Sequence, residues 1–181
     1  MSVFPATLLI AIARGCLEHF TLAVDGFAAC GDIRGHAVAL TGRTRAELTL
    51  AAVSYGTLID PEPLRAAAEA VVGEDPGVSG LLWAQLSQVY WTARRTPEAE
   101  AAARHALAIG ERDHLHFICA EALRSQWLAQ SQVMQVHEAL ASLVEGLRHA
   151  RQHGEAWVES CLLYTSPSPR DISGSRMPSS A

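Results

Sequence analysis

Histidine and cysteine side chains gather in one short segment, and they are the residues of this chain best suited to chemistry. His114, His116 and Cys119 fall within a span of six residues. Residues three apart share a face of a helix, so His116 and Cys119 would point the same way, and His114 could join them from a preceding turn. Imidazole and thiolate are ligands that zinc prefers. One hypothesis is therefore a metal-dependent enzyme that uses these three residues.

A second interpretation of these residues requires no metal. Cys119 suits a buried helical position, and the two histidines suit a polar turn. His149 and His153 are four residues apart and could also chelate a metal, but they lie among arginines at a helix end, where a solvated cationic face is favoured. The sequence contains no glycine-rich phosphate loop, no G-x-S-x-G and no H-E-x-x-H motif. We therefore predict that the protein is not an enzyme and uses no cofactor and no metal.

Composition and charge narrow the classes of partner. The 181-residue chain is 49% hydrophobic and 18% charged, as ordinary globular proteins are, and its formal net charge is -5. The basic residues are dispersed, so nucleic acid is not expected as a direct partner. The four cysteines have no CxxC spacing, which is typical of reduced thiols in the cytoplasm. The apolar N-terminus is too short for a membrane span and has no basic region before it, so we expect no membrane association.

The segment 80–111 is predicted to be a hairpin of two helices. The first helix would present one face of aromatic, leucine and small side chains, and the second would present a narrow stripe of alanines. These residues are Trp83, Leu86, Ser87 and Tyr90 in the first helix and Ala99, Ala103 and Ala106 in the second. The pattern W-x2-L-S-x2-Y followed by A-x3-A-x2-A resembles a tetratricopeptide (TPR) repeat.

Short acidic breaks recur along the chain at a nearly constant interval. Asp32, Asp75, Asp113 and Glu155 are separated by 43, 38 and 42 residues. An array of TPR-like repeats implies an all-α fold, a TPR-like α-solenoid of antiparallel helix hairpins with about seven helices. We expect helix pairs near 5–30, with a turn at Gly15, and near 35–73, 78–110 and 115–152, and the start of a further helix at 156–160.

The resemblance to TPR proteins also implies where a partner binds, because the first helix of each pair lines the concave surface of such arrays. Carried onto this sequence, that surface is made by Leu81, Ala84, Gln88 and Trp91 in the central repeat and by Glu121, Arg124 and Leu128 in the next. An exposed Trp91 would be an aromatic anchor for the partner. Alternatively, Trp91 packs against the adjacent repeat, because interior helices of a solenoid have neighbours on both sides.

A narrower resemblance suggests the setting of the array. The segments AEAAARHALAIGERD and HEALASLVEGLRHARQHGEAW are similar to the degenerate TPR arrays of bacterial ATPase-linked transcriptional regulators and nucleotide cyclases. This implies a cytoplasmic scaffold or sensor segment in signal transduction, whose partner is a protein or peptide, including a neighbouring ATPase or effector domain of the same longer chain. The alternative is the regulatory part of a multidomain ATPase or nucleotide cyclase whose catalytic domains lie outside this sequence.

Residues 161–181 differ in character from the rest of the chain. They are rich in serine and proline and have no helical period. The stretch CLLYTSPSPRD resembles the translation of a sequencing-library adapter, which implies that residues 1–160 are a fragment of a longer protein of metagenomic origin. We therefore expect a disordered, non-native tail that begins at Cys161 and whose removal leaves the stability of the protein unchanged.

Overall fold

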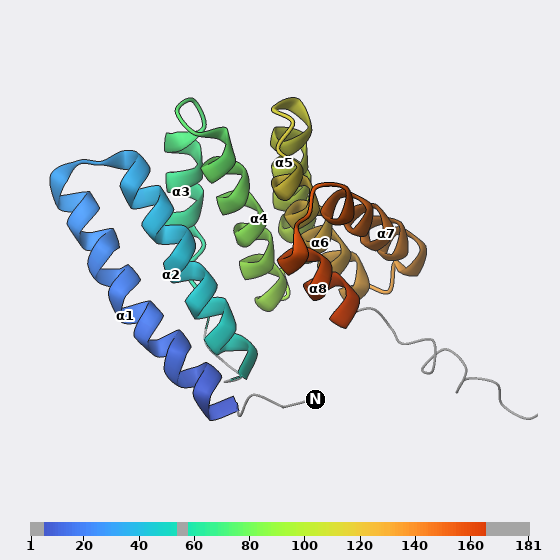
Figure 1. Cartoon of the computed structure of the whole chain (residues 1–181), viewed down its shortest axis with the longest axis horizontal. Coiled ribbons are helices and arrows are strands. Elements are labelled where there is room, and N and C mark those ends of the chain that lie inside the picture. The colour runs from blue at the N-terminus through green and yellow to red at the C-terminus, as the bar shows by residue number, and fades with distance from the viewer. Residues whose placement is uncertain (1–5, 54–57, 166–181) are drawn as a thin grey trace, which may run out of the picture.

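The computed structural model describes residues 6–53 and 58–165, and this part of the chain contains eight α-helices and no strand (Figure 1). The helices are α1 (Ala6–Cys30), α2 (Ile33–Val53), α3 (Glu62–Val71), α4 (Pro76–Thr92), α5 (Thr96–Arg112), α6 (His116–Gln132), α7 (Val136–Gln152) and α8 (Ala156–Thr165). The all-α prediction is confirmed. Within these residues, no helix combines the length and the apolar character that crossing a membrane requires. Most of the expected tail, from residue 166 onward, lies outside the described residues.

Helices α4 to α7 repeat with a period of twenty residues. Each contains 17 residues, and a linker of three residues joins each helix to the next. The middle residue of every linker has a left-handed backbone, with φ between 55° and 72°, at Arg94, His114, Met134 and Gly154. The following N–H donates to a carbonyl five residues earlier, as from Leu115 to Gly110 at 2.8 Å, which is the hydrogen bond of a Schellman motif. Two such steps account for the interval of about 40 residues between the acidic breaks in this half of the chain.

The left-handed linker residues lead to a prediction about stability. Met134→Gly should stabilise the protein by about 0.5 to 1 kcal/mol, because a Cβ is unfavourable at its φ of 60° and its exposed side chain loses little packing. Gly154→Ala, at the same place in the next linker, should destabilise it by about 1 kcal/mol, since the added methyl meets open space and only the backbone conformation is penalised. Urea unfolding followed by circular dichroism measures both changes. A Met134→Gly protein that is less stable than the wild type would contradict this account.

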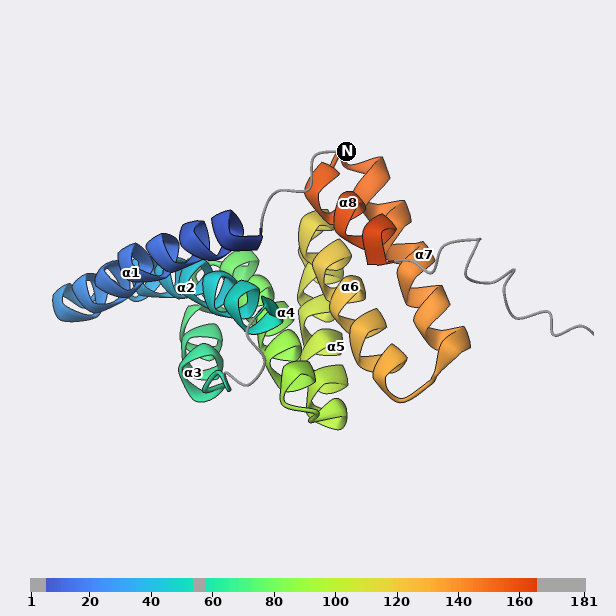
Figure 2. The ribbon, with the colours of Figure 1, turned by 90° about the horizontal axis from the view of Figure 1, so that it is seen from below.

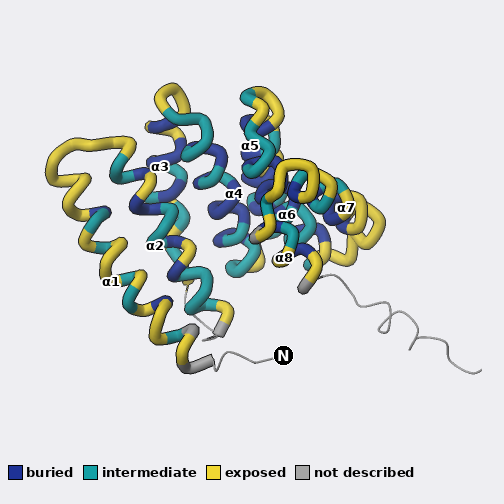
Figure 3. The backbone as a smooth tube through the Cα atoms, viewed as in Figure 1, coloured by how far each residue is buried: buried dark blue, intermediate teal, exposed yellow. Residues whose placement is uncertain are grey.

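The helices follow one another along the molecule and contact each other in a regular order (Figures 1 and 2). Helices α2, α4, α6 and α8 contact one another in succession, and we call them the inner layer. Helices α1, α3, α5 and α7 contact the inner helices that flank them in sequence but, over the described residues, do not contact each other. Inner helices therefore have neighbours on several sides, and α4 and α6 are the most deeply buried parts of the backbone (Figure 3).

The main hydrophobic core lies around α4. Leu82 and Leu86 of this helix are fully buried and pack with apolar side chains of α2, α3 and α5, including Leu40 and Leu64. Tyr90 is also buried, and the guanidinium carbon of Arg95 lies 4.6 Å from the centre of its ring. The helical face that the sequence predicted for this segment is therefore turned toward the core. Its burial holds α4 in place between the flanking helices.

The predicted helix pair near 5–30 is wrong. This segment forms one uninterrupted helix, α1, and Gly15 lies inside it instead of at a turn. A single interior glycine costs a helix only about 1 kcal/mol, and the packing of α1 along α2 outweighs that cost. The first hairpin is therefore α1 with α2, and the segment predicted as one pair near 35–73 supplies α2 and the short α3.

The predicted boundary at residue 160 is also wrong. Helix α8 continues from Ala156 to Thr165, past the point where the tail was expected to begin. Leu162 has no exposed surface and packs in a second core cluster with Val158, Leu143, Ala120 and Ala150. Leu162 lies four residues after Val158 and therefore on the same face of α8. This part of the expected tail belongs to the folded core.

Candidate functional site

A hollow of about 460 Å³ opens between α2, α4 and α6, and we call it the Trp91 hollow. Most of its lining is apolar, and arginine and amide groups stand around it. It is lined by Leu48, Ala51, Ala52, Leu58, Gln88, Trp91, Thr92, Arg94, Arg124 and Leu128. Apolar hollows with a few polar groups are the usual form of a binding site for a side chain or a small ligand. The hollow belongs to the inner layer, on which partner binding was predicted.

Trp91 takes part both in the hollow and in the core. Its side chain is half-buried and packs against the main core cluster, while another part of it lines the hollow. Its backbone carbonyl accepts a hydrogen bond from Nε2 of Gln132 on α6 at 3.2 Å. The sequence left two alternatives open for Trp91: packing against the adjacent repeat or lining an open surface. Each applies to one part of the side chain. Packing fixes the ring and leaves one portion accessible in the hollow.

Four of the seven residues predicted on the partner surface line the Trp91 hollow together: Gln88, Trp91, Arg124 and Leu128. Two others are placed differently, because Ala84 and Glu121 are buried at the contact between α4 and α6. The expectation that these two form part of an open surface is therefore corrected. The last residue, Leu81, lines a separate hollow at the other end of α4, beside His116. Helical spacing indicated which residues share a side of each helix but not the depth at which the neighbouring helix covers them.

The sequence analysis missed the contribution of α2 to this hollow. Leu48, Ala51 and Ala52 come from the last turns of α2, and Arg94 comes from the linker after α4. The spacing i, i+3, i+4 of the three apolar residues is a helical-face signal that was present in the sequence. Nothing in that local pattern, however, indicated that α2 would lie beside α4 rather than pair only with the helix after it.

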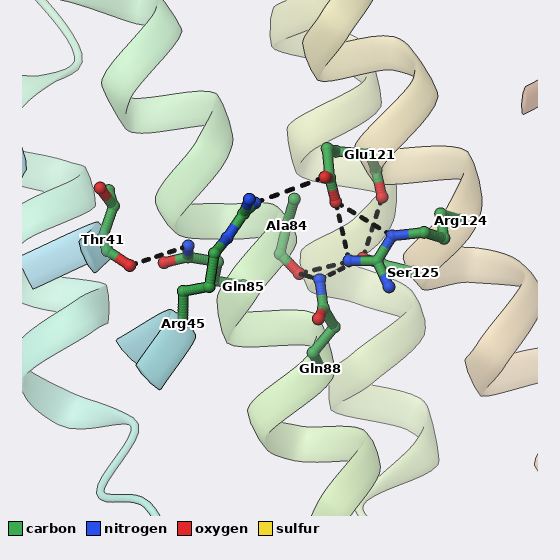
Figure 4. Close-up of polar contacts among 8 residues, drawn as sticks. All are labelled: Thr41, Arg45, Ala84, Gln85, Gln88, Glu121, Arg124 and Ser125. Atoms are coloured by element: carbon green, nitrogen blue, oxygen red, sulfur yellow. Dashed lines mark hydrogen bonds and ion pairs between the residues drawn. The ribbon is translucent and has the colours of Figure 1, made fainter. Parts of the chain in front are cut away.

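A buried carboxylate stands beside the hollow (Figure 4). Glu121 on α6 is only 1% exposed, and it pairs with Arg124 at 2.8 Å and with Arg45 on α2 at 3.4 Å. Burial of a charge is unfavourable unless the charge is paired, so the two arginines stabilise the buried carboxylate of Glu121. Arg124 also lines the hollow. The ion pairs therefore fix one of its walls and connect α2 to α6.

Hydrogen bonds between helices hold the same region together. Nε2 of Gln88 donates to Oγ of Ser125 at 3.2 Å, and that hydroxyl donates to the carbonyl of Ala84 at 3.1 Å (Figure 4). Nε2 of Gln85 donates to the carbonyl of Thr41 on α2 at 3.1 Å. These bonds connect α4 with both of its inner neighbours. They keep the spacing of the three helices, and hence the shape of the hollow, fixed.

Three histidines meet at the opposite end of α6, and we call them the histidine cluster. His116 begins α6, His149 lies in the last turn of α7, and His153 lies in the linker to α8. One ring nitrogen of each lies within 4.8 Å of one from each of the others. The rings of His116 and His153 are stacked, with centroids 3.4 Å apart and planes 2° from parallel.

The surroundings of His116 and His149 favour neutral rings. Burial lowers the pKa of His116 below its ordinary value of 6.5, and His153, His114 and Arg148 lower it further. Burial also lowers the pKa of His149, and Arg148 acts in the same direction, while Glu145 opposes them. Both imidazoles are therefore mainly neutral at pH 7, and each has a lone pair on one nitrogen.

The metal-ligand group first considered in the sequence is not assembled. Among the described residues, three potential ligands come together, and neither His114 nor Cys119 is one of them. Cys119 is buried against α5, where a Cβ added to Gly110 would lie 2.8 Å from its sulfur, and burial raises the pKa of its thiol. The hypothesis of a metal site at His114, His116 and Cys119 is corrected. The partners of His116 come instead from α7 and from the linker after it.

Comparison of the chain with protein-family models, with curated proteins and with solved structures finds no match.

Proposed function

We propose that this chain is a non-catalytic interaction module that binds a protein or peptide segment in the Trp91 hollow. The observation that supports the proposal is the meeting of Trp91 and Leu128 with apolar residues of α2 around one hollow of about 460 Å³. A half-buried tryptophan held by the core is preorganised, so binding does not have to order it first. Aromatic residues in such surroundings dominate the binding energy of many interfaces.

The residues around the hollow suggest the chemistry of the ligand. Arg94 and Arg124 line the Trp91 hollow, and the side chain of Arg94, just after the end of α4, is exposed. A segment that places an apolar side chain in the hollow and an acidic side chain near Arg94 would match both the shape and the charge. The resemblance to ATPase-linked regulators extends the proposal, because such a segment could belong to a neighbouring ATPase or effector domain.

Selection of phage-displayed peptides against the full chain tests this proposal. We expect the selected peptides to combine an apolar residue with an acidic one. Trp91→Ala should weaken their binding by at least about thirtyfold, the equivalent of roughly 2 kcal/mol for an aromatic anchor, as measured by fluorescence anisotropy. Arg94→Glu should weaken it by about tenfold without affecting the core, because this side chain is exposed.

Val144→Ala is the matched control, because this apolar side chain is exposed on α7, away from the hollow. It should leave the affinity unchanged. Circular dichroism at the temperature of the binding assay shows that each variant is folded. Selected peptides that bind the wild type, Trp91→Ala and Arg94→Glu equally well would show that the Trp91 hollow is not the binding site.

A further inference from the structure

The histidine cluster brings together three potential metal ligands from three different elements. His116, His149 and His153 come from the start of α6, the end of α7 and the α7–α8 linker. Three nitrogens bound to one zinc ion at about 2.0 to 2.1 Å lie roughly 3.3 Å apart, so separations of up to 4.8 Å must shorten by about 1.5 Å or less. Changes in side-chain torsion angles cover this distance without movement of the helices.

Two nitrogens of the cluster are buried without a hydrogen-bond partner among the described residues. They are Nδ1 of His116 and Nδ1 of His149. A buried polar atom in a folded protein normally has a partner, and an orphaned one calls for an explanation, such as an ion that binds there. Two such nitrogens from different helices in one cluster have a common explanation in a shared cation.

The carboxylate beside His149 also suits a role of this histidine as a metal ligand. Its Nε2 lies 3.4 Å from a carboxylate oxygen of Glu145, one turn earlier on α7. Histidines that bind metals through one nitrogen commonly donate the other N–H to a carboxylate, which orients the ring. Arg148 lies 3.1 Å from the same Nε2 and can only donate, so Nε2 donates to Glu145 in the ligand tautomer when the guanidinium turns fully to the Glu145 carboxylate, with which it already pairs.

The stacked rings indicate which ligand must move. A ligating imidazole holds the metal near its own ring plane, so the parallel rings of His116 and His153 cannot both bind one ion as they lie. His153 is exposed and precedes Gly154, and its ring can rotate out of the stack toward the other two. His116 and His149 are half-buried and would supply the fixed part of the site.

We propose that His116, His149 and His153 bind a divalent first-row transition-metal ion, with Zn²⁺ as the expected ion. Imidazole is a suitable ligand for zinc, copper and nickel, and three protein ligands leave a further position for water. That position would face a hollow lined by Leu81, Asp75 and Glu155. The bound ion would connect the start of α6 to the end of α7 and so stiffen the corner before α8. This site is separate from the Trp91 hollow.

Calorimetric titration of the untagged, metal-free full chain with ZnCl₂ tests the proposal, and Co²⁺ absorption reports the coordination. We expect one Zn²⁺ per chain. His116→Ala and His153→Ala should each weaken binding by more than about a hundredfold, and Glu145→Gln should weaken it by about 10- to 100-fold, the usual effect of losing an outer partner. The melting temperature of the wild type should rise with Zn²⁺ concentration, because the ion binds the folded state.

His137→Ala is the control, because His137 is an exposed histidine on α7 that does not belong to the cluster. It should bind Zn²⁺ like the wild type. His153→Ala remains decisive if His116→Ala fails to fold, because the side chain of His153 is exposed. Absence of stoichiometric Zn²⁺ binding, or equal affinity in the wild type and His153→Ala, would overturn the proposal.

Discussion

Leu162→Ala should destabilise the protein by about 2 to 5 kcal/mol, and removal of residues 161–181 should destabilise it at least as much. Leu162 has no exposed surface and packs with Val158 and Leu143 in the core cluster between α6, α7 and α8. Truncating a buried leucine removes its transfer free energy and leaves a cavity that the neighbouring side chains fill only partly. Urea unfolding followed by circular dichroism gives the free energy of unfolding.

Leu163→Ala provides the control for this prediction. Leu163 is the next residue in α8 and is 48% exposed, so its truncation should cost less than about 1 kcal/mol. The two substitutions remove the same atoms from the same helix and differ in burial. If both variants and the truncated protein unfold like the wild type, the end of α8 contributes nothing to the fold and the predicted boundary at residue 160 would stand.

Arg124→Met should destabilise the protein by about 3 kcal/mol, because it removes the closer partner of a buried carboxylate. Glu121 is 1% exposed, and Arg45 would remain as its partner at 3.4 Å. Breaking a buried ion pair by removing one partner typically costs about 3 to 5 kcal/mol, and the remaining arginine places the expected loss at the lower end. The methionine side chain keeps much of the apolar stem of the arginine, so the loss reports mainly the charge.

An exposed ion pair on α7 with the same spacing distinguishes the effect of burial on stability from the effect of spacing. Glu145 and Arg148 have the same separation of three residues as Glu121 and Arg124, but their side chains are 45% and 47% exposed. Arg148→Met should therefore cost less than about 1 kcal/mol. Glu121→Gln combined with Arg124→Met should recover part of the stability lost in Arg124→Met, because the uncompensated charge is gone. Equal losses in Arg124→Met and Arg148→Met would show that burial of Glu121 does not matter.

The Arg124 variant also links stability to the proposed binding site. Arg124 lines the Trp91 hollow as well as pairing with Glu121. Its loss should therefore alter peptide binding in addition to stability. For this reason, Trp91→Ala and Arg94→Glu are the more direct tests of binding, while Arg124→Met tests how the inner layer is held together.

The sequence by itself determined the helical class of this protein and the positions of its most regular helices. Periodic apolar residues and the acidic breaks predicted the helices near 78–110 and 115–152, where α4 to α7 lie. Helical spacing also placed Gln88 with Trp91 on one face of α4 and Arg124 with Leu128 on one face of α6, and the resemblance to TPR arrays put the two faces on one surface; all four residues line one hollow. The predictions made from spacing succeed because the residues within each helix are about one helical turn apart, so the spacing of the chain itself carries the information.

Only the tertiary structure decided which side chains are covered and which distant residues meet. Glu121 is buried because α4 lies against α6 and Arg45 reaches the carboxylate from α2, and Leu162 is buried because α8 packs onto α6 and α7. His116 and His153 are 37 positions apart in sequence, yet their rings stack. Local periodicity specifies which face of a helix a side chain lies on. Burial and side-chain clusters depend on which other helices pack against that face. The packing of whole helices sets those neighbours.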